Sequence, residues 1–311
     1  MSTPRNILNK QTTISLITAQ IPKRISKAFA LDDAGNLVKA PGGPLVKGTV
    51  ETRTIDNMAE FAALLETLTP AQALCFGVTG RDTATIVPQK DLRERPGAIS
   101  RTRDYFEWPD GSGVLLLDYD PKNGEDALPV DELIEQITVA VPELADAPAV
   151  AFPSASSCIW SVDVELRPTR GWHLFIQLAR ASDIPSAGEI ITKRLWLAGQ
   201  GYIALSKSGQ MLQRSLVDSS VWQPERLSFD GGSECGAGLE QRRGRPIIRN
   251  ADHEPIQTLA ALKPAEEKEY LAVLAGAKKA ARPESHAAQE IWTGERLDEW
   301  DKLRIPHEIG H

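Results

Sequence analysis

The sequence predicts a mixed α/β fold in which the helical content rises toward the C-terminus. Short apolar runs that end at turn residues, such as residues 114–117, are typical of buried strands. Longer segments, such as residues 55–68, place apolar side chains at helical spacing. From about residue 258 the composition changes to Ala, Lys, Glu and Leu, which favours helix. We therefore expect an α/β domain over residues 1–255 and a helical tail or accessory subdomain over residues 256–311.

Three helices are expected within the larger domain. Residues 55–68 form an amphipathic segment in which Asp56 is the expected N-cap. Residues 129–140 begin at Pro129, which suits the first turn of a helix because an N–H there has no partner inside the helix. Residues 183–198 form the third expected helix, which glycines close.

Strands are expected where apolar runs lie between turn residues. Residues 202–218 are interpreted as a hairpin, because two apolar runs flank the turn sequence KSGQ. The other runs are too short for helices, and polar or proline-containing segments follow them. These other expected strands are residues 73–79, 114–117, 148–152 and 171–178.

The C-terminal tail contains two prolines, Pro264 and Pro283. Proline removes a hydrogen-bond donor and interrupts a helix interior. We therefore expect the two prolines to divide the tail. Its composition fits a helical accessory module, and equally a linker to a helicase domain outside this chain.

Composition and charge exclude several classes of protein. The chain has 311 residues and a net charge of −7, which disfavours nonspecific coating of nucleic acid. No apolar run approaches the roughly 18 residues that span a bilayer. The polar N-terminus also lacks the apolar stretch of a signal peptide, so a cytoplasmic protein without membrane contact is expected. The three cysteines are far apart, which excludes a disulfide framework or a CxxC zinc site.

The segment LLLDYDP at residues 115–121 is the strongest chemical feature of the sequence. Asp118 and Asp120 are two residues apart, so in a strand their side chains point to the same face. Neighbouring carboxylates repel each other, and burial raises their pKa further. A Mg²⁺ or Mn²⁺ ion relieves both effects, because hard cations take oxygen ligands. The alternative is a solvated turn that ends a strand, but the apolar run directly before Asp118 favours a metal site.

Two later segments carry further polar residues at strand ends. The segment TRGWHLF places His173 early in a strand and beside Arg170, and this pair of side chains can bind phosphate oxygens. Alternatively, His173 is a partly buried histidine that hydrogen-bonds within its own fold. In RSLVDSSVW, Asp218 ends an apolar run as Asp118 does, and by itself it is equally an ordinary strand-end residue.

The segments LLLDYD, RGWH and SLVD occur in the order of the three motifs of the archaeo-eukaryotic primase superfamily. The chain resembles the primase–polymerase branch, which serves the replication of plasmids, phages and integrative elements. The segment VWQPERLSFDGG at residues 221–232 is similar to the stretch that comes after the third motif in that branch. The resemblance covers roughly residues 110–250.

The resemblance implies a catalytic core with a sheet like that of the RNA-recognition motif, flanked by an N-terminal α/β layer. It implies that Asp118, Asp120 and Asp218 are the catalytic acids and hold two divalent ions, Mg²⁺ or Mn²⁺. The implied activity is that of a nucleotidyltransferase, a DNA primase and polymerase that makes and extends primers on single-stranded DNA.

The same resemblance implies which residues bind the nucleoside triphosphate. His173 and Arg170 would contact the triphosphate, and fixed cations there stabilise the charge that develops on the leaving pyrophosphate. Arg226 comes shortly after the third motif and is the expected additional contact.

Arginine-rich segments fit a groove for the template or primer. Residues 242–249 read RRGRPIIR, and residues 92–103 add four more arginines. Arg242, Arg243 and Arg245 are the expected contacts to DNA phosphates. A solvated charged loop explains such runs equally well.

Three tryptophans, Trp160, Trp172 and Trp222, lie near the motifs and are candidates for stacking on single-stranded bases. For Trp172, strand alternation opposite His173 predicts a position in the core.

Two other classes of function remain open. A metal-dependent nuclease or another phosphotransferase can also use a DxD, although Arg170 and His173 favour nucleotide use. A non-catalytic replication-initiation module that binds DNA is the other possibility, and the presence of all three acids favours an enzyme. The sequence leaves open the choice between ribonucleotides and deoxynucleotides.

Overall fold

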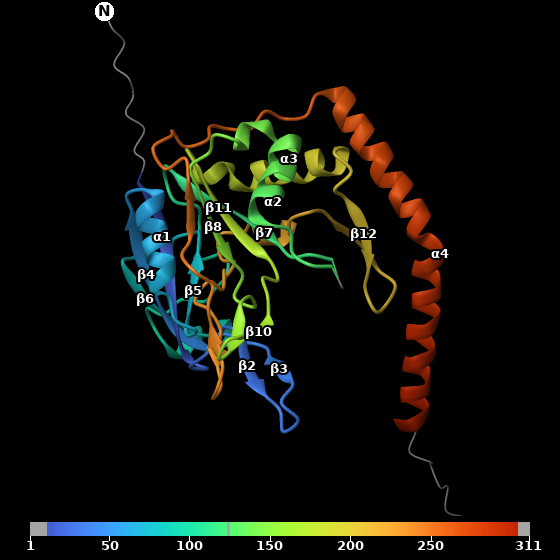
Figure 1. The fold of residues 1–311 in the computed structure, drawn as a ribbon, viewed down its shortest axis with the longest axis horizontal. Coiled ribbons are helices and arrows are strands. Elements are labelled where there is room, and N and C mark those ends of the chain that lie inside the picture. The colour runs from blue at the N-terminus through green and yellow to red at the C-terminus, as the bar shows by residue number, and fades with distance from the viewer. Residues whose placement is uncertain (1–10, 123–124, 304–311) are drawn as a thin grey trace, which may run out of the picture. The chain divides into compact units, whose positions relative to one another are not determined.

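A computed structural model of the chain describes residues 11–122 and 125–303. The chain divides into two compact units, one made of Met1–Ile191 with Val217–Ala261, the other of Thr192–Leu216 with Leu262–His311. Residues 1–10 lie outside the described residues. They include most of the segment from which we expected the absence of a signal peptide. The structure confirms the mixed α/β fold, with several antiparallel sheets and a C-terminal helix (Figure 1).

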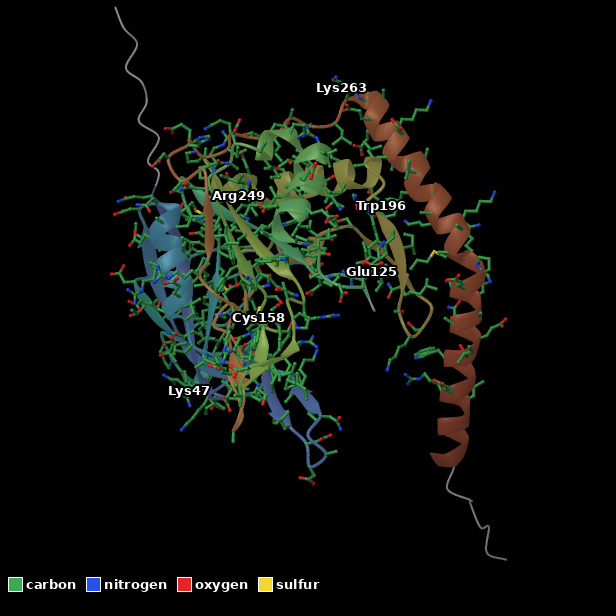
Figure 2. The ribbon with its side chains drawn as sticks, viewed as in Figure 1. Lys47, Glu125, Cys158, Trp196, Arg249 and Lys263 are labelled. Carbon is green, nitrogen blue, oxygen red and sulfur yellow. The ribbon has the colours of Figure 1, made fainter. Side chains whose placement is uncertain are left out.

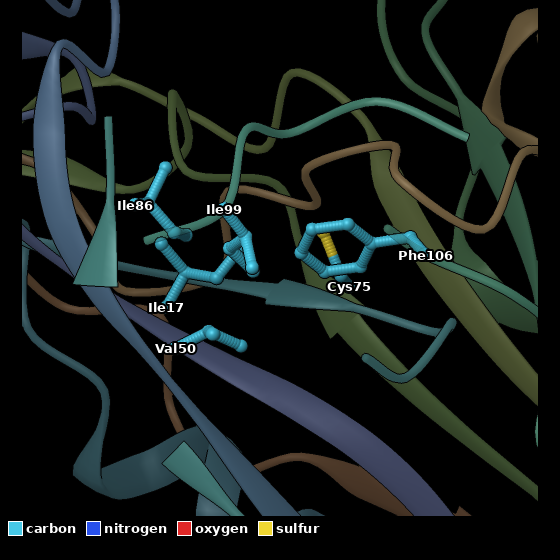
Figure 3. Packing of buried hydrophobic residues seen from close by; sticks show 6 residues of the cluster. All are labelled: Ile17, Val50, Cys75, Ile86, Ile99 and Phe106. Carbon is cyan, nitrogen blue, oxygen red and sulfur yellow. The ribbon is translucent and has the colours of Figure 1, made fainter. Parts of the chain in front are cut away.

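The first unit begins with a four-stranded antiparallel sheet, here called the N-terminal sheet. Its strand order is β5-β1-β4-β6. Alternation in β1 directs Ile17 into a buried cluster that includes Val50 and Phe106, and Figure 3 shows these side chains packed together. The strands are β1 (Thr12–Ile21), β4 (Lys47–Ile55), β5 (Gln72–Cys75) and β6 (Thr83–Ile86).

Helix α1 (Met58–Thr67) packs against strands of both four-stranded sheets of this unit. Its Phe61 ring meets Phe175 edge-on, with 5.0 Å between the ring centroids. The N-cap is Asn57, not Asp56 as predicted. The Asn57 side chain accepts hydrogen bonds from the backbone N–H groups of the second and third helical residues, at 3.0 Å each, as an N-cap does.

The second sheet, here called the central sheet, has the order β16-β8-β11-β7 with all neighbours antiparallel. Helix α2 connects β7 to β8, and β11 lies between these two strands, which makes a split β–α–β arrangement. Helix α3 follows β11. The elements are β7 (Gly113–Tyr119), α2 (Val130–Ala140), β8 (Ala149–Pro153), β11 (Trp172–Leu178), α3 (Ile184–Leu197) and β16 (Ile247–Arg249).

The predicted burial of β7 is confirmed, because all four residues of the apolar run 114–117 are buried. On the far edge of the sheet, Arg249 of β16 forms an ion pair with Asp131 of α2, with 2.7 Å between Nη1 and Oδ1; Arg249 is labelled in Figure 2. The two edge strands of the central sheet therefore differ: β7 is buried, whereas β16 carries an exposed ion pair.

Trp172 was predicted to lie in the core, and the structure places it partly exposed at the start of β11. It shares one face of the strand with the buried Leu174 and Ile176, and its indole N–H donates to the carbonyl of Leu128 at 3.0 Å. His173 and Phe175 share the other face, where their rings meet edge-on at 6.0 Å.

Smaller elements complete the first unit. One three-stranded sheet contains β2 (Ala28–Leu31), β3 (Leu37–Ala40) and β14 (Glu234–Cys235). Another contains β9 (Ile159–Ser161), β10 (Val164–Arg167) and β15 (Glu240–Gln241). The short 3₁₀ helices are η1 (Gln89–Glu94), η2 (Pro142–Leu144), η3 (Ala181–Asp183) and η4 (Ser219–Val221).

The second unit is a hairpin, β12 (Tyr202–Leu205) and β13 (Met211–Arg214), packed on helix α4 (Pro264–Leu303). Side chains bind the two together. Gln213 donates to the Tyr270 hydroxyl at 2.8 Å, and the Ser285 hydroxyl donates to the Gly209 carbonyl at 2.7 Å. We predicted a boundary in sequence order at residue 255, whereas these contacts join the hairpin to the C-terminal helix in one compact unit.

The expectation that prolines divide the tail also differs from the structure. Helix α4 begins at Pro264, where the missing N–H costs nothing, and continues through Pro283. Within the described residues, none of the helices is long and apolar enough to cross a membrane.

Candidate active site

Two neighbouring strands bring Asp118 and His173 together. In the antiparallel register of β7 and β11, Asp118 lies directly opposite His173. The distance between His173 Nε2 and Asp118 Oδ1 is 3.4 Å. The first and second sequence motifs therefore meet side by side, although more than fifty residues separate them in the chain.

Asp218 joins this pair through the backbone. Its N–H donates to the carbonyl oxygen of Asp118 at 2.8 Å. We predicted that Asp218 ends a hairpin strand, but β13 stops at Arg214 and Asp218 instead caps η4. Its carboxylate accepts hydrogen bonds from the Ser220 backbone N–H at 3.0 Å and from the Ser220 hydroxyl at 2.8 Å. This capping fixes the third acid beside the first.

Asp120 follows the end of β7, and Gly171 makes room for it. A Cβ atom at residue 171 would lie 2.7 Å from Asp120 Oδ1 and 2.4 Å from the carbonyl oxygen of Tyr119. Any other side chain would collide with these atoms. The glycine of the RGWH segment is therefore a steric requirement for the approach of the second motif to the first.

The electrostatics of the cluster are unusual. Burial raises the pKa of Asp118; His173 opposes this shift, whereas the nearby carboxylates of Asp120, Asp218 and Asp230 add to it. Burial by itself would lower the pKa of His173, but Asp118 and Asp230 together outweigh burial and raise it to about 9. At neutral pH the site thus holds an imidazolium among crowded carboxylates.

A cavity of about 510 Å³ opens at this cluster. Two of the three expected metal ligands, Asp118 and Asp120, line it together with His173, whereas Asp218 does not. Arg226, predicted from its place after the third motif, also lines the cavity and has an exposed side chain. Here we call this space the Asp118 cavity.

Sequence reasoning missed three residues of the cluster. Lys27 lines the cavity and is partly buried, and its ammonium group has no hydrogen bond or ion pair within the described part of the chain. The hydroxyl of Ser228, also in the lining, is buried and has no hydrogen-bond partner among the residues that the structure describes. The third is Asp230, which contacts His173. The sequence signal was weak: Lys27 and Asp230 are charged residues near the aromatic residues of ISKAF and SFDGG, and nothing pointed to Ser228.

Burial lowers the pKa of Lys27, and Asp120 and Asp118 act against that shift. A partly buried cation without an ion-pair partner is costly, since buried charges are normally paired. An anion in the cavity would remove that cost.

Arg170 does not line the cavity. Its backbone N–H donates to the Ser157 hydroxyl at 2.9 Å, and its guanidinium lies 3.9 Å from the exposed carboxylate of Asp126. The predicted contact of Arg170 with a triphosphate stays a prediction. Arg167 was not predicted as a site residue. Burial lowers the pKa of its guanidinium, and the nearby carboxylate of Asp120 acts against that shift.

The three arginines predicted to bind DNA differ in their surroundings. Arg243 stacks 4.1 Å from the centre of the Phe152 ring and donates to the carbonyls of Pro153 and Asp230, so its guanidinium is engaged within the fold. Arg242 lies over Trp160 and pairs with Glu240. Arg245 is 93% exposed.

These surroundings leave Arg245 as the most accessible of the three arginines. Of the tryptophans, Trp222 is buried and donates its indole N–H to the Leu116 carbonyl at 2.8 Å, so its ring is packed and does not form a stacking platform.

The donor set fits a divalent ion that is shared with a substrate. In residues 11–122 and 125–297, no three His, Cys, Asp or Glu side chains form a group that could hold a metal ion. Mg²⁺, however, is usually held by one or two carboxylates together with substrate phosphates and water. Asp118 and Asp120 supply such carboxylates, and the repulsion that raises the pKa of Asp118 would fall when a cation binds.

Comparison with known proteins gave no match of any kind: no family model, no curated protein and no solved structure is similar to the chain.

Proposed function

We propose that the chain is a metal-dependent nucleotidyltransferase, a DNA primase–polymerase of the archaeo-eukaryotic primase superfamily. The observation that carries the proposal is that residues of the three motifs lie next to one another, with Asp118, Asp120 and His173 lining one cavity and Asp218 beside Asp118. The β7–β11 register sets His173 opposite Asp118, and the backbone of Asp218 binds that of Asp118.

The arrangement of the central sheet supports the proposal. Strands β7, β8 and β11 and helices α2 and α3 follow the order β-α-β-β-α, with β11 between β7 and β8. This is the order of a ferredoxin-like split β–α–β unit, the kind of sheet that the resemblance implies for the catalytic core.

Asp118 and Asp120, with Asp218 beside them, would hold the divalent ions. A bound ion lowers the pKa of a primer 3′-hydroxyl and neutralises phosphate charge. In the reaction the 3′-oxygen forms a bond to the α-phosphorus, the bond to pyrophosphate breaks, and the hydroxyl proton leaves to solvent.

The cationic side of the Asp118 cavity suits the triphosphate. The carboxylates of Asp118 and Asp230 favour a positive charge on His173. Arg226 lines the cavity, and the ammonium of Lys27 lies near Asp118 and Asp120. Fixed cations of this kind stabilise the charge that develops on the leaving pyrophosphate. A site that only hydrolysed a phosphodiester would have less need of so many cations.

The test is an incubation of the protein with single-stranded DNA, labelled nucleotides and Mg²⁺ or Mn²⁺, with and without a primer. An Asp118→Ala/Asp120→Ala variant is the control. We expect products that the control does not make, and products without a primer would assign de novo priming. Shortening of labelled DNA without nucleotides would instead assign a nuclease. DNA binding with no reaction would assign a non-catalytic module.

A further inference from the structure

Asp230 lies outside the three motifs and contacts His173, on the side of the imidazole ring that faces away from Asp118. Its Oδ1 atom lies 2.5 Å from His173 Nδ1, and its side chain is 1% exposed. The other ring nitrogen of His173, Nε2, faces Asp118. The imidazole is therefore held between two carboxylates, one buried and one in the cavity lining.

The contact with Asp230 determines which nitrogen faces the cavity. Because the carboxylate accepts from Nδ1–H, the imidazole plane and the direction of Nε2 are both fixed. A histidine without this partner could rotate about its side-chain bonds and turn Nε2 away from Asp118.

The fold anchors Asp230 independently of His173. The Arg243 guanidinium donates to the Asp230 carbonyl at 2.9 Å and to the Pro153 carbonyl at 3.3 Å, and it stacks on Phe152, which lies opposite His173 in the β8–β11 register. The next residue, Gly231, approaches the backbone of Thr69 so closely that a Cβ would lie 1.9 Å from its carbonyl oxygen.

The hydrogen bonding of the second carboxylate oxygen of Asp230 favours a positioning role over a purely structural one. Oδ2 is buried and has no hydrogen-bond partner within the described residues. A buried carboxylate that served only to hold the fold together would be expected to use both oxygens, because an unsatisfied buried oxygen costs stability. Here a single oxygen is used, and its partner is His173.

We propose that Asp230 is a positioning residue that orients His173, so that Nε2 points into the Asp118 cavity toward the phosphates of the bound nucleotide. The inference rests on the proposed function for the identity of the ligand. The orientation of the ring rests on geometry alone. Asp230 acts through His173 and does not itself touch the nucleotide.

The test is a double-mutant cycle on nucleotide incorporation with Asp230→Asn and His173→Ala. Asparagine keeps the shape of the side chain but loses the charge that holds the imidazole. By analogy with carboxylate partners of ligating histidines, we expect Asp230→Asn to reduce kcat by about 10–100-fold. In the His173→Ala background the same change should have almost no effect. The matched control is Asp183→Asn, since Asp183 pairs with Arg180 away from the cavity, and it should keep full activity.

Equal losses from Asp230→Asn in the two backgrounds would overturn the proposal, because Asp230 would then act without His173. A second measurement does not need activity: ¹⁵N NMR of the imidazole should show a strongly hydrogen-bonded Nδ1–H in the wild type that is weakened in Asp230→Asn. An unchanged Nδ1–H signal in the variant would also overturn the proposal. A wild type that shows this signal but incorporates no nucleotide would refute the proposed function and leave the orientation of His173 intact.

Discussion

The two four-stranded sheets of the first unit differ in the charge of the polar side chains that they bury. In the N-terminal sheet the buried polar side chains are neutral and have neutral partners, such as Ser15 donating to the Gly77 carbonyl and Thr12 paired with Ser112. The central sheet instead holds the ionisable groups of Asp118 and His173 at the ends of adjacent strands.

The difference shows which part of the first unit contains groups that lower the stability of the fold. Buried charges are costly unless they are paired, and like charges side by side add to that cost. The N-terminal sheet avoids the cost altogether. The central sheet accepts it in one place, around the Asp118 cavity, which is the behaviour expected of a functional site.

The largest effect is expected from Asp118→Asn in the central sheet. Loss of a metal-ligating carboxylate removes several kcal/mol of transition-state stabilisation, so incorporation should fall about a thousandfold. Stability should not fall with it. The pKa of Asp118 is raised, so its ionised form destabilises the fold above that pKa, and a neutral amide removes the cost. Incorporation assays and thermal melting measure the two effects separately, and a folded variant with wild-type activity would exclude Asp118 as a ligand.

For Ile17→Ala in the N-terminal sheet we expect a loss of stability without a loss of turnover. Ile17 is fully buried in the cluster of Figure 3, so its truncation should cost about 2–5 kcal/mol of unfolding free energy. Denaturant unfolding measures that loss. The folded fraction should keep its turnover, since Ile17 does not line the Asp118 cavity. A strong fall in turnover per folded molecule would show that the two sheets are not separable in this way.

An intermediate effect is expected from Lys27→Met. Methionine keeps most of the length of the side chain but removes the unpaired ammonium, so nucleotide affinity should fall about tenfold, the loss of one charge-assisted contact. Calorimetric titration measures it, and Lys90→Met, at an exposed position of the 3₁₀ helix η1, is the matched control. Equal affinities of the wild type and Lys27→Met would remove Lys27 from the nucleotide site.

The smallest effect is expected from Arg245→Gln. Its guanidinium is exposed, and at 3.9 Å from Glu66 it makes at most a weak ion pair. If Arg245 binds one DNA phosphate, the slope of log affinity against log salt should become smaller by about 1. Arg53→Gln, on β4 of the N-terminal sheet, should leave the slope unchanged. An unchanged slope for Arg245→Gln as well would place the DNA elsewhere.

The sequence predicted the strands that carry the site because apolar runs and turn residues are local signals. The apolar run before Asp118 forms the buried strand that we expected. Gly171 was also visible in the sequence, but its close approach to Asp120 was not predicted. The N-cap of α1 was assigned one residue too early, which is an error of local detail.

Long-range packing lay beyond such signals. Lys27 lies far before Ser228 in the chain, and the two meet only in the lining of the folded cavity. Asp230 contacts His173, which lies 57 residues before it in the chain. Arg243 is a different case: its sequence context suggested a DNA contact, which stays a prediction, and the fold engages its guanidinium with two backbone carbonyls. Charge by itself does not distinguish an arginine that binds a ligand from one that binds its own backbone.

The most direct test of the central claim is the equilibrium binding of a nucleoside triphosphate, with and without Mg²⁺, to the wild type and to Asp118→Asn. If the acids and cations of the Asp118 cavity form one site, Mg²⁺ should strengthen binding to the wild type at least about tenfold and have little effect on the variant. Binding that is equally tight with and without Mg²⁺ in both proteins, or no binding at all, would contradict the assignment of this cavity as a metal–nucleotide site.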